Sequence, residues 1–196
     1  MKKLFIACMM LSTILSPYLF AADSAPEFTL NDIAGQQHSL SSYKGKFVVL
    51  EWSNPDCPFV KKHYNSGNMQ SLQKTYTEKG VIWLTINSSA PGKQGNYPAD
   101  ELANIAKLNN SVPTAILQDL DGKVGRAYGA KTTPHMFVIN PDGKLIYQGA
   151  IDDNSSPNPE DAKSAKNYVQ AALDEAMAGK DVSEPSTPSY GCSVKY

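Results

Sequence analysis

The sequence has 196 residues, of which 41% are hydrophobic and 19% charged, and its formal net charge is −1. A single domain with a sizeable core is expected at this length and composition. The mildly acidic balance, without a basic stripe, argues against nucleic acid and anionic membrane surfaces as partners.

The first 22 residues have the features of a secretory signal peptide. Met1-Lys2-Lys3 is a short basic region, residues 4–15 are apolar, and residues 19–22 offer small side chains for cleavage. The apolar run is too short for a membrane span, and an uncleaved N-terminal anchor is the alternative. Cleavage would leave 16 of the 18 basic residues against 19 acidic ones, a net charge of −3. We therefore expect export, most simply to a bacterial periplasm, and no membrane association of the mature chain.

Cleavage would also remove Cys8 and leave two cysteines, Cys57 and Cys192. Two cysteines in an oxidising compartment are expected either to pair or to react. The cysteine count alone does not decide between these two outcomes.

The first half of the mature chain predicts two strands joined by a helical crossover. Residues 27–30 and 36–40 indicate a short β-hairpin around Gly35, ahead of the main fold. Residues 47–52 and 81–86 are almost continuously apolar, which is typical of parallel strands buried on both faces. The segment 58–79 between them predicts a helix interrupted near Gly67, and hence a right-handed crossover.

The second half predicts a helix, three strands and a final helix. The helix begins with Pro98 at its first position, and a short strand follows at residues 116–117. An antiparallel pair, 135–139 and 144–147, is joined by a Pro-Asp-Gly turn. The last helix is predicted over residues 159–178, with Asn158 as its cap.

The remaining tail, residues 180–196, has almost no periodicity and alone would be expected to be disordered. It ends, however, in Ser189-Tyr190-Gly191-Cys192-Ser193-Val194-Lys195-Tyr196. Two tyrosines and a cysteine are unusual in a solvated tail, so a docked tail carrying Cys192 is the competing interpretation.

Cys57 has the setting of a reactive thiol. It follows an apolar strand and precedes Pro58, which fits the first position of a helix because proline lacks the N–H that would be unpaired there. Free backbone N–H groups and the positive helix end favour a thiolate at Cys57. Lys61, four residues on, is expected to add positive charge. An inert buried cysteine is the alternative.

Glu51 is a charged residue within an apolar strand. Burial of a carboxylate is costly, so Glu51 is expected to be paired, exposed at the strand end, or raised in pKa. A raised pKa would suit a proton shuttle for thiol chemistry; a Glu at the edge that pairs with a lysine is the alternative. His63 and His135 are further candidates for acid–base assistance, with surface or hydrogen-bonded structural roles as alternatives.

The order strand, Cys-Pro helix, strand, helix, Thr-Pro, β-hairpin, helix resembles the thioredoxin-like superfamily. Within it, the chain is most similar to the atypical, peroxiredoxin-like branch of the redoxin group, the alkyl hydroperoxide reductase and thiol-specific antioxidant proteins. The resemblance is carried by four stretches: NPDCPFVKKHYNSGNMQ, INSSAPGKQG, YGAKTTPHMFVINPDGKLIYQGAIDD and GCSVKY.

This resemblance implies one thioredoxin-like α/β domain over residues 23–179, with a mixed central sheet flanked by helices. It implies that Cys57 is the reactive cysteine and that Pro134 is a cis-proline facing it. It also implies that the Thr133 backbone helps to dock an extended substrate, and that Glu51 is the buried acid beside the active site.

The chain departs from both parent patterns. Thioredoxins have a second cysteine where this chain has Val60, so a four-residue disulfide ring cannot form. Typical peroxiredoxins have Thr or Ser where this chain has Asn54, and Pro where it has Leu50. A peroxidase also needs an arginine, and Arg126 is the only arginine in the sequence; a solvated turn residue is its alternative role.

The leading hypothesis is an exported thiol–disulfide oxidoreductase in which Cys57 is the nucleophile and Cys192 the distant resolving cysteine. The alternatives are a two-cysteine thiol peroxidase with an antioxidant role, and a non-enzymatic domain held by a structural Cys57–Cys192 disulfide. Metal transfer by Cys57 with His63 or His135 is a remote fourth. We expect a protein or small-molecule disulfide, a thiol or a peroxide as the reaction partner, and no cofactor or resident metal.

Overall fold

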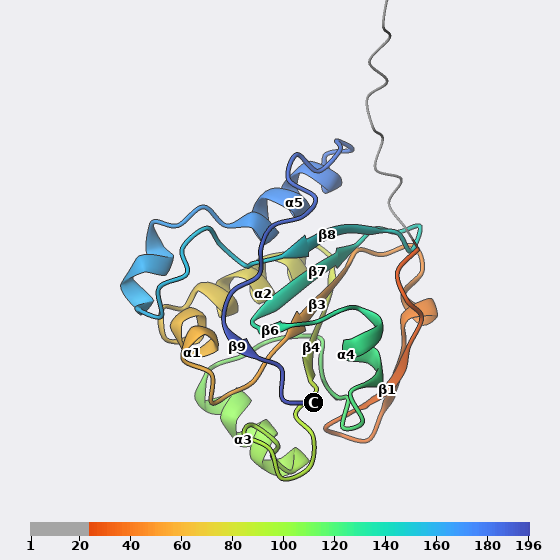
Figure 1. Ribbon diagram of the computed structural model, residues 1–196. Helices are drawn as coiled ribbons and strands as arrows, with labels where there is room; N and C mark the ends of the chain where they lie inside the picture. The colour runs from red at the N-terminus through yellow and green to blue at the C-terminus, as the bar shows by residue number, and fades with distance from the viewer. Residues whose placement is uncertain (1–23) are drawn as a thin grey trace, which may run out of the picture.

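The computed structural model describes residues 24–196, so the predicted signal peptide and Cys8 lie outside the described residues. A seven-stranded mixed sheet with strand order β2-β1-β5-β4-β3-β7-β8 forms its centre (Figure 1). The strands of this sheet are β1 (Thr29–Asp32), β2 (Gln37–Ser39), β3 (Val48–Trp52), β4 (Ile82–Asn87), β5 (Ala115–Gln118), β7 (His135–Ile139) and β8 (Leu145–Gly149). Two further two-residue strands, β6 (Thr132–Thr133) and β9 (Cys192–Ser193), pair only with each other.

The helices surround the sheet, and two separate hydrophobic cores lie on its two faces. The helices are α1 (Pro58–Asn65), α2 (Asn68–Glu78), α3 (Ala99–Leu108), α4 (Lys123–Ala127) and α5 (Tyr168–Met177), with single 3-10 turns η1 (Leu40–Tyr43) and η2 (Pro159–Lys163). One core joins α1, α2 and α5 to one face of the sheet. The other core joins the N-terminal segment and the end of α4 to the opposite face. In the part of the chain that the structure describes, no helix is both long and apolar enough to cross a membrane.

The buried centre of the sheet is the parallel pair β3 and β4. Val48 lies opposite Ile82 and Trp52 opposite Ile86, with the α1–α2 segment as the crossover between the strands. All five residues of β3 are buried. Side chains on both faces of such a strand must be apolar or fully hydrogen-bonded, which explains the continuous apolar run. The predicted strands and crossover are confirmed.

Local signals place the start and the break of the α1–α2 crossover. Cys57 is the N-cap of α1 with extended backbone, and Pro58 occupies the first turn. Gly67 has a φ of 77°, a left-handed conformation that glycine adopts without strain, and it separates α1 from α2. Both features agree with the sequence prediction. Pro98 differs slightly, because it is the N-cap of α3 rather than its first residue.

The N-terminal hairpin belongs to the main sheet. β1 pairs with β2, as predicted, but it also pairs antiparallel with β5, where Asn31 lies opposite Gln118. The hairpin therefore forms one edge of the seven-stranded sheet instead of an extension ahead of it.

The prediction of one long final helix is wrong. The chain forms η2 first, then leaves helical geometry, and α5 begins only at Tyr168. Backbone pairing explains the interruption, because Asp153 N donates to Lys166 O and Tyr168 N donates to Ile151 O. Asn158 caps only the short η2 turn, whereas Asn167 caps α5 by accepting from Gln170 N at 2.9 Å.

The C-terminal tail is docked along its length instead of being disordered. After α5 it runs past β8, β6 and α4 (Figure 1). Thr187 N donates to Gln148 O at 3.1 Å, and Val194 N donates to Lys131 O at 3.1 Å. The Tyr196 hydroxyl donates to Ala130 O at 2.8 Å. The tail therefore adds a peptide strand beside the Thr-Pro loop.

Asn167→Ala is expected to lower the free energy of unfolding by about 1 kcal/mol, because it removes the side-chain cap of a helix that packs on the core. Asn158→Ala, which affects only an exposed turn, is the matched control and should cost less. Urea unfolding of the reduced proteins measures both. An equal or larger loss for Asn158→Ala would contradict the interrupted helix.

Candidate active site

The backbone of the β3–α1 turn fixes Cys57 at the start of the helix. Cys57 N donates to Asn54 O at 3.0 Å, and the Asn54 side chain accepts from Asp56 N at 2.9 Å. Asn54 is buried and also donates to Gln94 O. The residue that departs from the peroxiredoxin pattern is thus a structural element of this turn.

Cys57 lies against the Thr-Pro loop and is fully buried. Its Sγ lies 3.0 Å from Thr133 O, and the Thr133–Pro134 peptide bond is cis. The geometry brings together three of the predicted site residues, Cys57, Thr133 and Pro134, from segments 76 residues apart in the chain.

The tail brings Cys192 to the same place. β9 pairs antiparallel with β6, so that Thr133 lies opposite Cys192 and Thr132 opposite Ser193. Gly191 passes so close over the loop that a Cβ on it would overlap the Thr133 carbonyl oxygen. Cys192 is partly exposed, Cys57 is not, and both are free thiols. This strand pairing sets the two predicted cysteines side by side.

The environment of the two thiols makes them unequal. Burial opposes ionisation of Cys57. Several hydrogen bonds outweigh burial, among them one from the Cys192 thiol and one from the Val60 backbone, and the pKa of Cys57 lies below its ordinary value. Burial, together with the hydrogen bond to Cys57, raises the pKa of Cys192 to about 11. Cys57 is therefore the more readily ionised of the two thiols.

Glu51 is buried at the centre of the sheet and has no lysine partner among residues 24–196, which argues against the edge-facing ion pair. Its carboxylate accepts four hydrogen bonds from neutral donors, at 2.9 to 3.1 Å: Tyr64 Oη, Gln73 Nε2, Trp83 Nε1 and Thr85 Oγ1. Burial raises the pKa of Glu51, and these hydrogen bonds offset that effect only in part. Its direct contacts are with this network and not with the Cys57 thiol.

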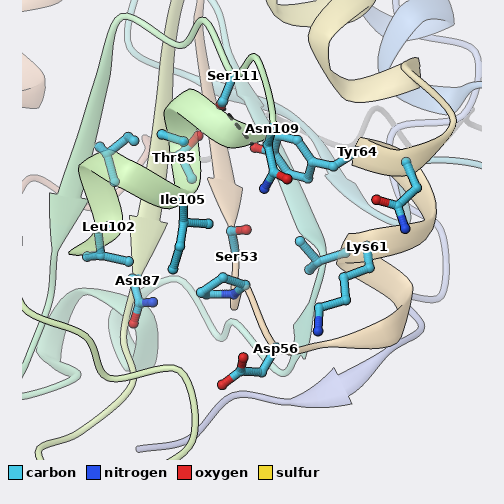
Figure 2. A pocket seen from close by; sticks show the side chains of 15 residues that line it. Ser53, Asp56, Lys61, Tyr64, Thr85, Asn87, Leu102, Ile105, Asn109 and Ser111 are labelled. Carbon is cyan, nitrogen blue, oxygen red and sulfur yellow. Dashed lines mark hydrogen bonds between the residues drawn. The ribbon is translucent and has the colours of Figure 1, made fainter. Parts of the chain in front are cut away.

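Other predicted residues lie around the site without touching the thiols. Lys61 is exposed, and its backbone N donates to Cys57 O. Its side chain reaches a cavity of about 290 Å³ between α1 and α3. Figure 2 shows Lys61 and Asp56 at one end of this cavity and Tyr64, Asn109 and Ser111 at the other.

The histidines and the arginine have other partners. His63 contacts Tyr190 and Asn68, and burial followed by the Lys62 charge lowers its pKa to about 3. His135 accepts from Lys131 N, and burial lowers its pKa to about 4. Both are neutral, hydrogen-bonded residues near pH 7. Among residues 24–196, no group of three or more His, Cys, Asp or Glu side chains is arranged to hold a metal ion.

Arg126 lies on α4 rather than in a turn. Its Nη1 donates to Asp121 O at 2.8 Å, and its guanidinium stacks over the Tyr196 ring, 4.3 Å from the ring centroid. These contacts attach the end of the tail to α4 and direct the guanidinium toward Tyr196.

A buried polar cluster around Lys62 of α1 was not predicted. Lys62 Nζ lies 3.0 Å from Asp152 Oδ2, and both side chains are almost fully buried. The Tyr190 hydroxyl from the tail donates to Asp152 and also contacts Lys62 and His63. The only sequence signal was the tyrosine two residues before Cys192, since nothing local shows which residue of the Lys61-Lys62-His63 run points inward.

Fold and site define a thioredoxin-like redoxin, an α/β protein with a cysteine at a helix start facing a cis-proline. The chain belongs to the AhpC/TSA family, whose model matches residues 21–148. The family resemblance and the predicted fold class are thus confirmed.

Curated relatives are similar over about two-thirds of this chain. The thiol-disulfide oxidoreductase ResA of Geobacillus thermodenitrificans is 29% identical over 122 residues, which cover 62% of this chain and 64% of the relative. ResA of Bacillus subtilis is 26% identical over 129 residues, covering 62% and 63% respectively. The chain thus spans less than two-thirds of the length of these relatives.

Solved structures extend the similarity to most of the chain. An uncharacterized conserved protein from Geobacillus kaustophilus has a TM-score of 0.77 and 29% identity, covering 89% of this chain and 91% of that one. A thioredoxin domain of a Bacteroides vulgatus thiol-disulfide oxidoreductase has a TM-score of 0.52 at 19% identity, covering 65% and 86%. The latter supports the fold alone.

Cys192→Ala is expected to raise the pKa of Cys57, because it removes the thiol that donates to the Cys57 thiolate. Cys57→Ala should in turn bring the pKa of Cys192 down from about 11. Ultraviolet absorbance of the thiolate against pH measures both. Ser193→Ala, at the exposed neighbour of Cys192, is the control and should leave Cys57 unchanged. An unaltered Cys57 pKa in Cys192→Ala would refute the coupling.

Glu51 should make stability fall as the pH rises. Its folded pKa lies above the unfolded value of about 4.5, so its contribution is complete below that pH and is lost as the pH rises through the folded pKa. Glu51→Gln does not ionise. The unfolding free energy of the wild type minus that of the variant should therefore decrease above pH 4.5, by at most about 1.4 kcal/mol per pH unit. Urea unfolding at several pH values tests this, and a constant or widening difference contradicts it.

Proposed function

We propose that the protein is an exported thiol–disulfide oxidoreductase in which Cys57 is the nucleophile and Cys192 the resolving cysteine. The observation that carries the proposal is the pairing of Thr133 with Cys192, which places Cys192, whose pKa is raised to about 11, beside Cys57, whose pKa is lowered. The curated relatives that bear the name thiol-disulfide oxidoreductase support the class of reaction.

The first step is attack of the Cys57 thiolate on one sulfur of a substrate disulfide. A bond forms between Cys57 and that sulfur, the substrate S–S bond breaks, and the second substrate sulfur leaves as a thiolate that takes up a proton. The lowered pKa of Cys57 favours its thiolate, which is the form needed for attack.

In the second step Cys192 loses its proton and attacks the Cys57 sulfur of the mixed disulfide. The Cys57–Cys192 bond forms, and the first substrate sulfur leaves as a thiol. The substrate has gained two electrons and the cysteine pair has lost two. An external dithiol reductant must then restore the pair, and the reverse sequence oxidises a substrate dithiol.

The functional unit in this proposal is the domain 23–179 together with the tail 180–196. The tail supplies half of the redox pair, so neither part performs both steps alone. Export, most simply to a bacterial periplasm, agrees with a protein whose cysteines cycle through a disulfide. The partners are protein or small-molecule disulfides and thiols.

Reduction of a protein disulfide by the purified chain, in the presence of a small dithiol, tests the proposal. Cys57→Ser should abolish turnover. Cys192→Ser should instead accumulate a mixed disulfide between Cys57 and the substrate, visible as a mass increase that a reductant reverses. Ser193→Ala serves as the control with unchanged turnover.

A parallel assay with hydrogen peroxide separates the peroxidase alternative, which would use the same two cysteines. If each peroxide molecule consumed forms one Cys57–Cys192 disulfide, and disulfide substrates are not reduced, the protein is a thiol peroxidase and the proposal is wrong. If the protein turns over neither disulfides nor peroxide, both enzyme functions are wrong and a structural Cys57–Cys192 disulfide is the remaining interpretation.

A further inference from the structure

The tail residue Tyr190 occupies a site that the rest of the fold builds. Lys62 and His63 lie on α1, and Asp152 follows β8, so none of these three residues belongs to the tail. The side chains of all three are at most 1% exposed. The Tyr190 phenol enters this cluster from the chain segment that passes over the active-site loop.

Each hydrogen-bonding position of the Tyr190 hydroxyl has a partner in this cluster. Asp152 accepts the hydroxyl hydrogen of Tyr190. Lys62 Nζ donates to the phenol oxygen at 3.3 Å, and His63 Nε2 lies 3.0 Å from it. His63 Nδ1 accepts from the Asn68 side chain, so that Nε2 carries the hydrogen and donates. One acceptor and two donors thus satisfy the single hydrogen and the two lone pairs of a phenol oxygen.

The aromatic ring of Tyr190 is also held. The Phe59 ring meets it edge-to-face with centroids 5.9 Å apart, and Lys62 Nζ lies 5.3 Å from the centroid. Phenylalanine would keep the ring contacts but would leave Asp152 and His63 without their hydroxyl partner. Unpaired buried polar groups are costly, so the site discriminates tyrosine from phenylalanine.

The spacing couples this site to the thiol. From Tyr190 the chain crosses Thr133 at Gly191 and reaches Cys192, which pairs with Thr133 beside the buried Cys57. An external extended peptide that presents a cysteine to Cys57 would have to take the place of β9, because β9 occupies this edge of β6. The residue two positions before its cysteine would then meet the Lys62–His63–Asp152 cluster, hereafter the phenol subsite.

We propose that the edge of β6 and the phenol subsite together select extended polypeptide substrates carrying a tyrosine two residues before the reacting cysteine, and that the chain's own tail occupies this position as an internal copy of such a substrate. This proposal rests on the function proposed above, since it assigns specificity to the same Cys57 reaction. The phenol subsite binds the tyrosine of the substrate, and Cys57 carries out the thiol–disulfide exchange.

The test uses the full chain with Gly191→Ala and Cys192→Ser. The first change lifts the tail from Thr133 by steric overlap, and the second removes the internal resolving thiol. The probe is a peptide copying residues 185–196, with its cysteine joined by a disulfide to 2-nitro-5-thiobenzoate. Attack of the Cys57 thiolate on the peptide sulfur forms the new disulfide and releases the coloured thiolate, which reports the rate.

The peptide with Tyr at the position of Tyr190 should react at least about tenfold faster than the same peptide with Phe, the advantage expected of a hydrogen bond to a charged group. A peptide with Ala in place of Ser189 is the matched control and should keep the full rate. Asp152→Asn, placed in the same protein background, should reduce the advantage of Tyr over Phe.

The two proposals fail in different ways. Equal rates for the Tyr and Phe peptides, with rapid reaction of Cys57 toward the small reagent 5,5′-dithiobis(2-nitrobenzoate), would overturn the phenol subsite and leave the oxidoreductase intact. Circular dichroism matching the wild type shows that the variant is folded. A folded variant that releases no coloured thiolate from either reagent would overturn Cys57 as the nucleophile, and both proposals with it.

Discussion

The antiparallel pairing of β9 with β6 is the interaction on which the site depends. Without it the chain has one buried cysteine at a helix start, since Val60 occupies the position of a second cysteine in thioredoxins. A ladder of two residue pairs is too short to be stable alone. It is held by side chains on either side of Cys192, Tyr190 in the phenol subsite and Tyr196 on Arg126. The two cysteines are therefore brought together by aromatic residues at some distance from the sulfurs.

Two buried ionisable side chains, Glu51 on β3 and Lys62 on α1, are held in different ways. Glu51 is surrounded by neutral donors, which agrees with a pKa that burial raises. Lys62 is paired with Asp152 and with the hydroxyl of the tail. Removal of one partner from a buried ion pair costs about 3–5 kcal/mol. Substitution of either Lys62 or Asp152 alone is therefore expected to be destabilising, and the same pair holds the hydroxyl of the tail.

Much of the fold could be predicted from local patterns. Continuous apolar runs located β3 and β4, the Pro-Asp-Gly turn located the pair β7 and β8, and Cys57-Pro58 and Gly67 located the start and the break of the crossover helix. These signals are local, because they depend on backbone preferences and on burial of whole strands. The final helix was mispredicted because its interruption comes from backbone pairing between residues 151–153 and 166–168, which no local pattern shows.

The site could be predicted in part for the same reason. The expected roles of Cys57 and Cys192 come from cysteine count and motif, but their juxtaposition depends on a tail without periodicity. Lys62 escaped prediction because only tertiary packing decides that it, and not Lys61, points inward. Arg126 was considered for peroxide chemistry, whereas its observed partners are Asp121 and Tyr196.

A disulfide between Cys57 and Cys192 would close a loop of more than a hundred residues. By lowering the entropy of the unfolded chain, it would stabilise the folded state by about 4–5 kcal/mol. Its formation is the central claim, and a peptide map of the mildly oxidised, monomeric protein under non-reducing conditions tests it most directly. The account predicts one dominant linked pair of peptides containing Cys57 and Cys192, converted to two separate peptides by reduction. Oxidation of Cys57 to a sulfinic acid while Cys192 stays free, or linkage only between different molecules, would contradict it.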